Sequence, residues 1–338
     1  MSYEVVLEDK YYLRELIESV SLTDSLDQIS YEARINLRIP ESGLAIAPGQ
    51  TIRVSGVPYG GKEMVYLLNP GVVWECTSSN RGSKSLSLVV YDRTIYLAKS
   101  EDEYLFSSGG TASQRLKKYA QDWQIKLASI PDTGKALSKA TYRSQPIYNM
   151  IVTDLRETVK LGGDAYMPRM TPAGLELFKI GSNKTVWKLE ALEGIDQHRT
   201  LEGTVTKVKV IGSTDSSKPA STGASSDKNK ADPPSQFLAV ETGEVSKFGT
   251  LQRIVQDEDV KTPADAKKLA KGMLTGLQET FTVNGLDINT LRAGDKVELN
   301  GLELIVMSVS HELGDPGRMS LELGSYDYVK RRYYLNYG

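Results

Sequence analysis

The sequence predicts an α+β protein that is mainly β, with two related small β-barrel domains separated by an inserted α/β domain. Strand-like alternation of polar and apolar residues fills the first part of the chain and returns in the last part. Helical spacing of apolar residues dominates the middle. We place the first barrel at residues 1–96, the α/β domain at 97–190 and the second barrel at 191–338.

The first domain is expected to consist of short antiparallel strands. Residues 30–39 alternate polar and apolar side chains, and residues 51–54, 72–76 and 85–91 repeat the pattern. Glycine, proline and asparagine punctuate the stretches between them. Alternation with a period of two places one face of each strand on a core and the other in solvent or against a neighbour.

The middle domain is expected to combine two helices with a β-hairpin. Thr111 and Gln114 have the spacing of a capping box, and apolar residues at helical spacing follow them. A second helix is predicted to begin at Pro146 and to stop at Gly162. Residues 166–180 then have the pattern of a hairpin that closes a small α/β unit.

The last domain is expected to return to strands, with two interruptions. Strands are predicted from Thr200, and they continue from Phe281 after a helix over residues 263–280. Residues 212–235 contain no Ile, Leu, Val, Met or aromatic residue. Such a segment cannot bury enough apolar area to offset the entropy of ordering, so we expect a disordered loop there.

An internal repeat links the first and last domains. Each copy has a bend at a glycine, a polar residue, a strand of period two and a turn that ends in glycine. A further strand and a similar ending follow in both copies. Chance recurrence of such patterns in a β-protein is the alternative, but agreement in order across three successive elements favours a duplication. The matched segments are 44–56 with 288–301, 73–76 with 305–309, and 85–92 with 319–327.

The repeat has a consequence for assembly. Homo-oligomers favour closed symmetry. A trimer in which each subunit contributes two similar barrels would form a ring of six similar units. Such a ring could join a six-fold tube on one face to a three-fold object on the other.

Composition limits the classes of function. The chain has 41 Lys and Arg against 43 Asp and Glu, which argues against a dedicated nucleic-acid binder. No run approaches 18 apolar residues and no secretory signal is expected at Met1, so we predict no membrane partner. The single cysteine, Cys76, cannot form an intramolecular disulfide, which fits synthesis in the cytoplasm.

The search for chemistry predicts no catalytic, cofactor-binding or metal-binding residue. His198 has no second ligand at useful spacing, and HExxH or CxxC motifs are absent from the sequence. His311 ends a predicted strand beside Glu312 and could form half of an acid–base or interface pair, but a structural histidine is the simpler interpretation. Cys76 is expected to be a small buried hydrophobe. The two glycine-rich turns lack full phosphate-loop spacing: Gly60-Gly61-Lys62 and Gly109-Gly110-Thr111.

The last stretch of the chain is dense in aromatic and basic residues. Residues 326–334 read YDYVKRRYY. An amphipathic C-terminal strand with a solvated basic tip and a partner-docking edge are both compatible with this composition. Contact with DNA in transit through a tube is a third interpretation.

Several segments together are typical of one protein family: residues 47–54, Tyr91-Asp92-Arg93 with Tyr96-Leu97, 125–133, 147–155 and 291–312. In these segments the chain resembles the tail hub proteins of contractile phages, PBSX-type defective prophages and tailocins. The resemblance implies two tube-like barrels per subunit and a homotrimeric, non-enzymatic structural protein of the virion baseplate. Its implied partners are the tail tube protein, the central spike, baseplate wedge proteins and the tape measure, with DNA only in transit and no cofactor.

Two alternatives remain open at this point. One is a tail-associated peptidoglycan hydrolase, because carboxylate pairs are arranged in space and cannot be excluded from sequence. The other is a spike-type component of a contractile secretion system, a family that shares hub-like domains. The sequence does not assign a role to residues 212–235, identify the particle or say whether isolated subunits form trimers.

Overall fold

The computed structural model describes residues 2–39, 45–80, 84–190, 192–211, 237–256, 260 and 262–335. They divide into two compact units, the first made of residues 1–197 and 280–338 and the second of residues 198–279. The loop predicted over residues 212–235 lies outside the described residues.

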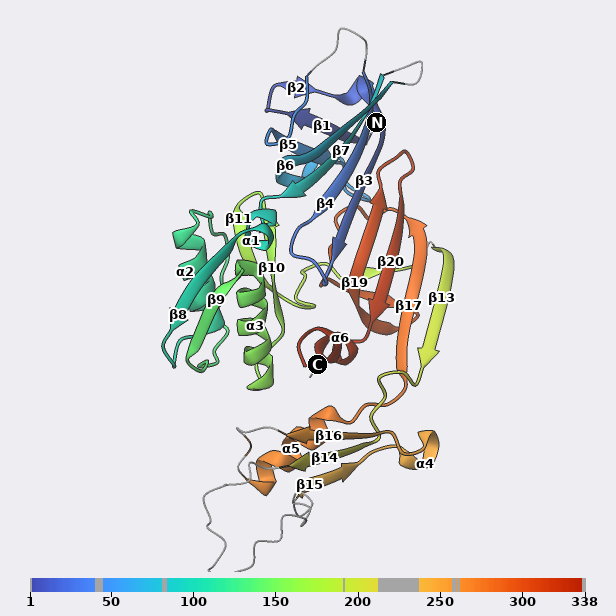
Figure 1. Ribbon diagram of the computed structural model, residues 1–338. Helices are drawn as coiled ribbons and strands as arrows, with labels where there is room; N and C mark the ends of the chain where they lie inside the picture. Colours follow the sequence, from blue (N-terminus) through green and yellow to red (C-terminus); the bar gives the residue numbers. More distant parts are fainter. Residues whose placement is uncertain are drawn as a thin grey trace, which may run out of the picture. The chain divides into compact units, whose positions relative to one another are not determined.

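Five strands of the first unit form a β-module that we call module 1 (Figure 1). They pair in the order β3-β4-β7-β6-β5, and every pair is antiparallel. The alternation seen in the sequence is realised, since every second residue of β4 is buried. The strands are β3 (Ile17–Ser25), β4 (Glu32–Ile39), β5 (Thr51–Gly56), β6 (Val65–Asn80) and β7 (Lys84–Asp92). Beyond β5 lie β1 (Tyr3–Leu7) and β2 (Tyr11–Tyr12), with a 3-10 turn at Arg14–Leu16.

Module 2 has the same strand order as module 1. Its strands pair as β13-β17-β20-β19-β18. Strands β17, β18, β19 and β20 of module 2 correspond in chain order to β4, β5, β6 and β7 of module 1. With β13 in the place of β3, the two modules have the same pairing order. The strands are β13 (Leu192–Thr200), β17 (Gln278–Leu286), β18 (Lys296–Leu299), β19 (Leu302–Glu312) and β20 (Arg318–Gly324). A two-residue strand, β12 (Trp187–Lys188), pairs with β18 in parallel.

The correspondence extends to single hydrogen bonds at the bend that precedes β5 in module 1 and β18 in module 2. The N–H of Gly49 donates to the carbonyl of Val73 at 2.8 Å, and the N–H of Gly294 donates to the carbonyl of Val306 at 2.8 Å. Both glycines have positive φ, +94° and +88°, a region that favours glycine. Val73 is therefore the counterpart of Val306.

A β-bulge follows at the same place in both modules. In module 1 the register between β6 and β7 shifts directly after the pair Val73↔Val90. In module 2 the register between β19 and β20 shifts directly after Val306↔Leu323. Counting on from these pairs makes Ser325 the counterpart of Asp92. The sequence comparison had instead aligned Asp92 with Asp327, because it matched the Tyr-Asp dipeptides rather than the strand registers.

The mainly β, α+β class is confirmed, and the two modules are related as predicted. No closed barrel is detected among the described residues. Instead β19 also pairs with β3, which joins the two modules into one 13-stranded sheet that runs from β13 to β2. Each module nevertheless keeps a hydrophobic core of its own, with Ile35 and Leu88 in one and Val283 and Leu321 in the other.

The inserted α/β region combines helices α2 and α3 with the β10–β11 hairpin and a two-stranded antiparallel sheet of β8 and β9. The capping box at Thr111 and Gln114 is present, as predicted. The second helix was predicted to begin at Pro146 and begins one residue later, with Pro146 as its N-cap. In its core Arg115 forms an ion pair with Asp154 at 2.6 Å. The elements are α1 (Ile95–Lys99), β8 (Glu101–Phe106), α2 (Ala112–Asp122), β9 (Ala140–Pro146), α3 (Ile147–Lys160), β10 (Tyr166–Thr171) and β11 (Gly174–Lys179).

The second unit is a three-stranded sheet with a helix against one face. The strands pair in the order β15-β14-β16, and Val208, Val210 and Val255 pack against Ala266 and Ala270. The helix predicted over residues 263–280 ends at Met273, because Leu274 adopts an extended conformation. The elements are β14 (Lys207–Ile211), β15 (Phe237–Thr242), α4 (Val245–Phe248), β16 (Gln252–Gln256) and α5 (Pro263–Met273).

The last element is a helix, so the interpretation of residues 326–334 as a strand is wrong. Helix α6 (Tyr326–Tyr333) begins after Ser325, whose hydroxyl accepts a hydrogen bond from the N–H of Tyr328. This N-cap and the burial of Val329 outweigh the β preference of the tyrosines. None of the helices in the described residues has the length and apolar character that crossing a membrane requires.

Candidate assembly interface

The junction between the two modules is a strand-to-strand contact. Strand β19 pairs with β3 in antiparallel fashion, from Ser308↔Ser25 to Glu312↔Ser21. The same five residues of β19 pair with β20 on their other edge. Main-chain hydrogen bonds between β19 and β3 therefore hold module 2 to module 1.

A buried ion pair reinforces the junction. Arg292, in the bend before β18, donates from Nε to the carboxylate of Asp24 on β3. The same carboxylate oxygen accepts the N–H of Ala293 at 3.2 Å, and Asp24 is 2% exposed. The Arg292 guanidinium also lies over the ring of Tyr31, 3.9 Å from its centroid. The Arg292 side chain is 14% exposed and that of Asp24 only 1%, so the buried carboxylate depends on the arginine of the other module for its countercharge.

A second buried carboxylate lies close to this ion pair. Asp92, at the end of β7, accepts the N–H of Tyr31 at 3.1 Å and the N–H of Thr94 at 2.8 Å. The hydroxyl of Thr94 also donates to it. Burial raises the pKa of Asp92 to about 6, although these hydrogen bonds oppose the shift. Burial likewise raises the pKa of Tyr31.

His311 ties the bend of module 2 to β19. Its Nε2 lies 2.9 Å from the carbonyl of Leu291, and because a carbonyl only accepts, Nε2 carries a hydrogen. Its Nδ1 lies 2.6 Å from the carboxylate of Asp287. The ring is fully buried, and both of its nitrogens are used within one module. This arrangement gives His311 a structural role, with Asp287 rather than the adjacent Glu312 as its partner.

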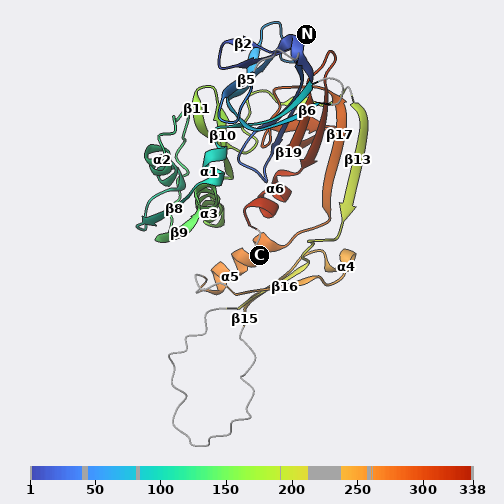
Figure 2. The same ribbon diagram turned by 45° about the horizontal axis from the view of Figure 1, so that its top comes forward.

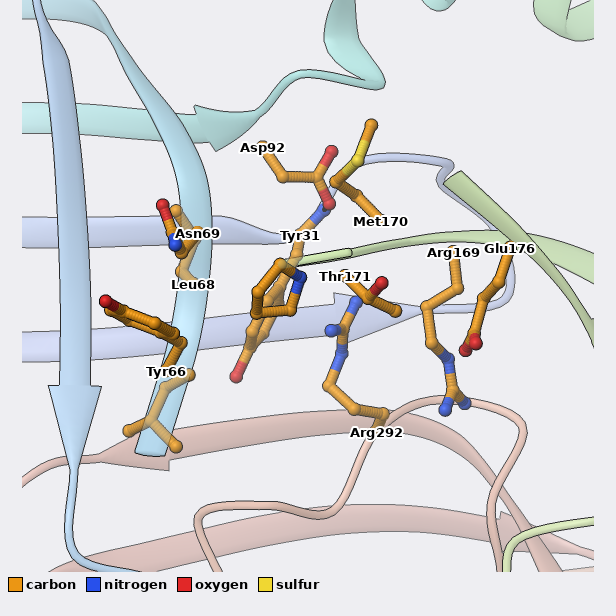
Figure 3. Close-up of a pocket in the computed structure, with 12 residues that line it drawn as sticks. Tyr31, Tyr66, Leu68, Asn69, Asp92, Arg169, Met170, Thr171, Glu176 and Arg292 are labelled. Carbon is orange, nitrogen blue, oxygen red and sulfur yellow. Dashed lines mark hydrogen bonds between the residues drawn. The ribbon is translucent and has the colours of Figure 1, made fainter. Parts of the chain in front are cut away.

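A cavity of about 180 Å³ lies beside the junction, between module 1, the β10–β11 hairpin and the bend of module 2 (Figure 3). Tyr31, Arg169 and Arg292 line it, together with Asp92 and Glu176. The Tyr31 hydroxyl and the Nε of Arg169 are buried without a hydrogen-bond partner among the described residues. Positive and negative groups are balanced around the cavity, so its lining does not favour one sign of ligand charge.

The remaining candidates from the sequence are scattered. Cys76 is half-buried in β6, where burial raises the pKa of its thiol, and its Sγ lies 3.5 Å from the carbonyl of Ile46. His198 is exposed on β13. Gly61 forms a tight turn after Pro58, and Thr111 is a helix cap. Across the part of the chain that the structure describes, no three His, Cys, Asp or Glu side chains form a group that could hold a metal ion.

Sequence reasoning missed the Asp24–Arg292 ion pair. The two residues are 268 positions apart, and nothing in the segment that contains Arg292 indicates a partner in β3. One signal was available, because Arg292 takes the place of Ala47 when the two bends are aligned on Gly49 and Gly294. A charge present in only one copy of a repeat marks a position where the two copies have different neighbours.

Comparison with known proteins agrees with the fold and the resemblance. The sequence model of the YQBQ-like family matches residues 20–324. The uncharacterized protein YqbQ of Bacillus subtilis is 26% identical over 277 residues, which cover 79% of this chain and 76% of YqbQ. XkdQ, a protein of the phage-like element PBSX of the same organism, is 28% identical over 210 residues, covering 60% of this chain and 61% of XkdQ.

A solved structure extends the likeness over nearly the whole chain. The 43 kDa tail protein of prophage MuSo2 from Shewanella oneidensis superposes with a TM-score of 0.70 at 13% identity. The match covers 97% of this chain and 99% of the tail protein, so the two share a fold. The predicted resemblance to PBSX-type tail proteins is confirmed. The chain belongs to the YQBQ-like family and has the fold of a prophage tail protein.

Proposed function

We propose that this chain is a structural hub subunit of the baseplate in a contractile phage tail or a phage-tail-like particle. Three copies would form a ring that joins the six-fold tail tube on one face to a three-fold central spike on the other. The observation that carries the proposal is that the two modules share the same strand order and have a β-bulge at the same place in corresponding strand pairs. Two equivalent modules per chain let three chains present six similar surfaces.

Symmetry matching requires this kind of duplication. A single-module subunit in a three-fold ring would contact only every second subunit of a six-fold tube. With two modules held in one compact unit, as residues 1–197 and 280–338 are, each tube subunit meets a module of nearly the same shape. The inserted region and residues 198–279 occur once per chain and would therefore follow the three-fold symmetry of the spike and wedge side.

The partners follow from this position. We propose that the tail tube protein contacts the ring of modules and that the central spike, the wedge proteins and the tape measure contact the remaining surfaces. The relation to a protein of the phage-like element PBSX supports assembly into such a particle after synthesis in the bacterial cytoplasm. DNA would meet the ring only in transit.

We also propose that the chain has no enzymatic role. Two of the buried polar groups described above have structural partners: His311 is held within one module, and Asp24 pairs with Arg292. A zymogram of the purified full chain on bacterial cell walls tests this proposal. We expect no cleared zone, and cell-wall lysis would overturn the purely structural role.

The native mass of the purified chain, alone and with its tube and spike partners, tests the hub proposal. We expect three times the mass of one chain, with binding to preformed tail tubes at one end. A monomer or dimer in the presence of both partners would contradict the proposal.

A further inference from the structure

We infer that two sheet faces which the fold leaves open bind each other between neighbouring copies of this chain. The first is the face of the β15-β14-β16 sheet that carries Lys207 and Lys209, and we call it the basic face. The second is the face of the β8–β9 sheet that carries Glu101 and Glu103, and we call it the acidic face. The inference rests on the proposed hub, since it requires several copies in one particle, and it involves neither of the two modules.

The basic face is open because helix α5 packs on the other side of the sheet (Figure 2). Val208 and Val210 of β14 are fully buried in the core that this helix covers. Successive side chains of a strand point to opposite faces, so Lys207, Lys209 and Ile211 lie on the side away from α5. All three are only half-buried, in contrast to the two valines.

Exposed apolar side chains surround Lys209 on the basic face. Its partner in register on β15 is Val240 and its partner on β16 is Ile254, and partners in register share a face. Both of these side chains are exposed. The Nζ of Lys209 also lies 4.8 Å from the centroid of the ring of Phe237, which is exposed as well. Contiguous exposed apolar side chains are typical of a binding surface.

The charge on this face is positive. Among the described residues of the three strands, Glu241 is the only acidic one. It lies on the α5 side of the sheet, where its carboxylate is 3.7 Å from the Nζ of Lys267. The basic face therefore offers two ammonium groups beside an apolar patch, and this combination fits an apolar surface that carries carboxylates.

The outward face of the β8–β9 sheet is a surface of that kind. Tyr104 of β8 packs edge-to-face on Tyr119 of α2, with 4.7 Å between the ring centroids. Alternation along the strand therefore points Glu101, Glu103 and Leu105 away from α2. The inserted region thus presents two carboxylates and an aliphatic side chain to its surroundings.

The two faces also carry the most exposed apolar groups of the molecule. Leu105 on the acidic face and Ile254 on the basic face are the two most exposed large aliphatic side chains of the described residues, at 68% and 53%. On β9, Tyr142 is buried and the next residue, Arg143, is exposed, so the acidic face carries two negative charges against one positive. Contact between the faces would cover both aliphatic side chains and bring groups of opposite net charge together.

The spacing of the side chains matches along the two central strands. Residues 207–211 of β14 read KVKVI, and residues 101–105 of β8 read EDEYL. The outward side chains are therefore Lys, Lys and Ile on one strand and Glu, Glu and Leu on the other, each two residues apart. Sheets that pack face to face keep their strands within about 30° of each other, so β14 and β8 can lie alongside with both charges and the aliphatic side chains matched.

A second copy of the chain is the occupant that the charges favour. Two basic faces would bring lysines together, and like charges placed opposite each other disfavour such a contact. Every chain has one face of each kind, so the basic face of one copy can bind the acidic face of the next. Such a contact is heterologous and can close around the three-fold axis of the proposed hub.

Cross-linking between two differently tagged chains tests the contact. Both chains carry Cys76→Ser; one also carries Ile254→Cys, the other carries Leu105→Cys, and the two are expressed together. Since each chain has a single cysteine, a cross-link that joins the two tags must join two copies. Packed sheets lie about 10 Å apart, which places facing cysteines within reach of a short bis-maleimide. We expect a cross-linked species that contains both tags.

The matched control moves the cysteine of the first chain to the other side of the same sheet. Lys268→Cys on α5 is also exposed, and with Leu105→Cys in the second chain it should give no cross-linked species with both tags. Equal yields for Lys268→Cys and Ile254→Cys would contradict the assignment of the contact to the basic face.

Charge reversal tests the complementarity. Lys207→Glu with Lys209→Glu in the first chain should lower the yield of the cross-linked species at least about tenfold, because like charges then face each other. Adding Glu101→Lys with Glu103→Lys to the second chain should restore the yield. A yield that does not change on reversal would contradict the pairing of the two faces.

Native mass measured on the same samples separates this contact from the hub proposal. A trimer in which the chains with Ile254→Cys and Leu105→Cys do not cross-link overturns the contact and leaves the hub proposal standing. A particle of two chains that does cross-link supports the contact and contradicts the hub. A chain that stays monomeric with its tube and spike partners present overturns both. A trimer that cross-links and responds to charge reversal supports both.

Discussion

The two β-modules share one topology but have different neighbours. In module 2 the outer edge of β19 is covered by β3 of module 1, and Arg292 in the bend pairs with the buried Asp24. In module 1 the corresponding edge of β6 is exposed, and the corresponding bend has Ala47. The backbone hydrogen bonds of the two bends are nevertheless the same. The registers and turns therefore specify the order of the strands in both modules. The side chains differ, and only the bend of module 2 carries the arginine that pairs with β3.

The Asp24–Arg292 ion pair is the largest chemical difference between the modules, and breaking it should have the largest effect. We expect Arg292→Ala to lower the free energy of unfolding by about 3–5 kcal/mol, because it leaves the carboxylate of Asp24 buried without a countercharge. The matched control is Arg38→Ala, which removes an exposed pair with Glu18 at 3.0 Å and should cost less than about 1 kcal/mol. Chemical denaturation of the full chain measures both.

A double variant tests whether the effect belongs to the pair. Asp24→Asn combined with Arg292→Met should cost clearly less than the sum of the two single substitutions, because neither partner is then left as an isolated charge. Equal losses for Arg292→Ala and Arg38→Ala would contradict the role of the ion pair.

The ends of the modules differ in a way that pH can reveal. Module 1 ends in Asp92, whereas module 2 has Ser325 at the corresponding position. Because burial raises the pKa of Asp92 to about 6, the folded state binds a proton more tightly than the unfolded state does. Its contribution to stability is complete below the ordinary aspartate pKa and is lost as the pH rises through about 6.

The Asp92→Asn variant lacks this titration. Relative to that variant, the wild-type chain should lose about 3 kcal/mol of unfolding free energy between about pH 4 and pH 7, which corresponds to roughly two pKa units. Denaturation at a series of pH values measures the difference. A difference between the two proteins that stays constant over this range would contradict the raised pKa.

The two bend glycines give the smallest expected contrast and the most direct comparison of equivalent positions. A Cβ at Gly294 would lie 2.8 Å from the Sδ of Met167, whereas a Cβ at Gly49 would have no atom of the described residues within 4 Å. Both substitutions to alanine incur backbone strain of about 1–3 kcal/mol, and overpacking adds about 1–3 kcal/mol at Gly294 alone. Thermal or chemical unfolding should therefore show that the Gly294→Ala variant is less stable than the Gly49→Ala variant. The reverse order of stability would contradict the tighter packing at Gly294.

Local patterns predicted most of the fold, because each depends on residues that are close in sequence. The capping box at Thr111, the helix start after Pro146 and the glycine bends at Gly49 and Gly294 are all specified within a few residues. The repeat was detectable for the same reason. The C-terminal helix was missed because its stability depends on the Ser325 cap and on burial of Val329 in a hydrophobic cluster shared by the inserted region and β19. Such burial is not visible in a run of tyrosines and arginines.

The junction between the two modules was much harder to predict from the sequence. Nothing near Asp24 or Arg292 indicates that they meet, because the contact depends on how one module packs on the other. The closed barrels were expected from alternation alone, which gives the faces of a strand but not its neighbours at the edges. The neighbours at the strand edges emerge only once the strand order is known.

Electron microscopy of the purified oligomer, viewed along its axis, tests the central claim most directly. Two equivalent modules per chain predict class averages with six similar lobes at one radius around a central opening, related by three-fold symmetry. Averages with three lobes at that radius, or with two-fold symmetry, would contradict the claim that three of these chains form a six-fold surface.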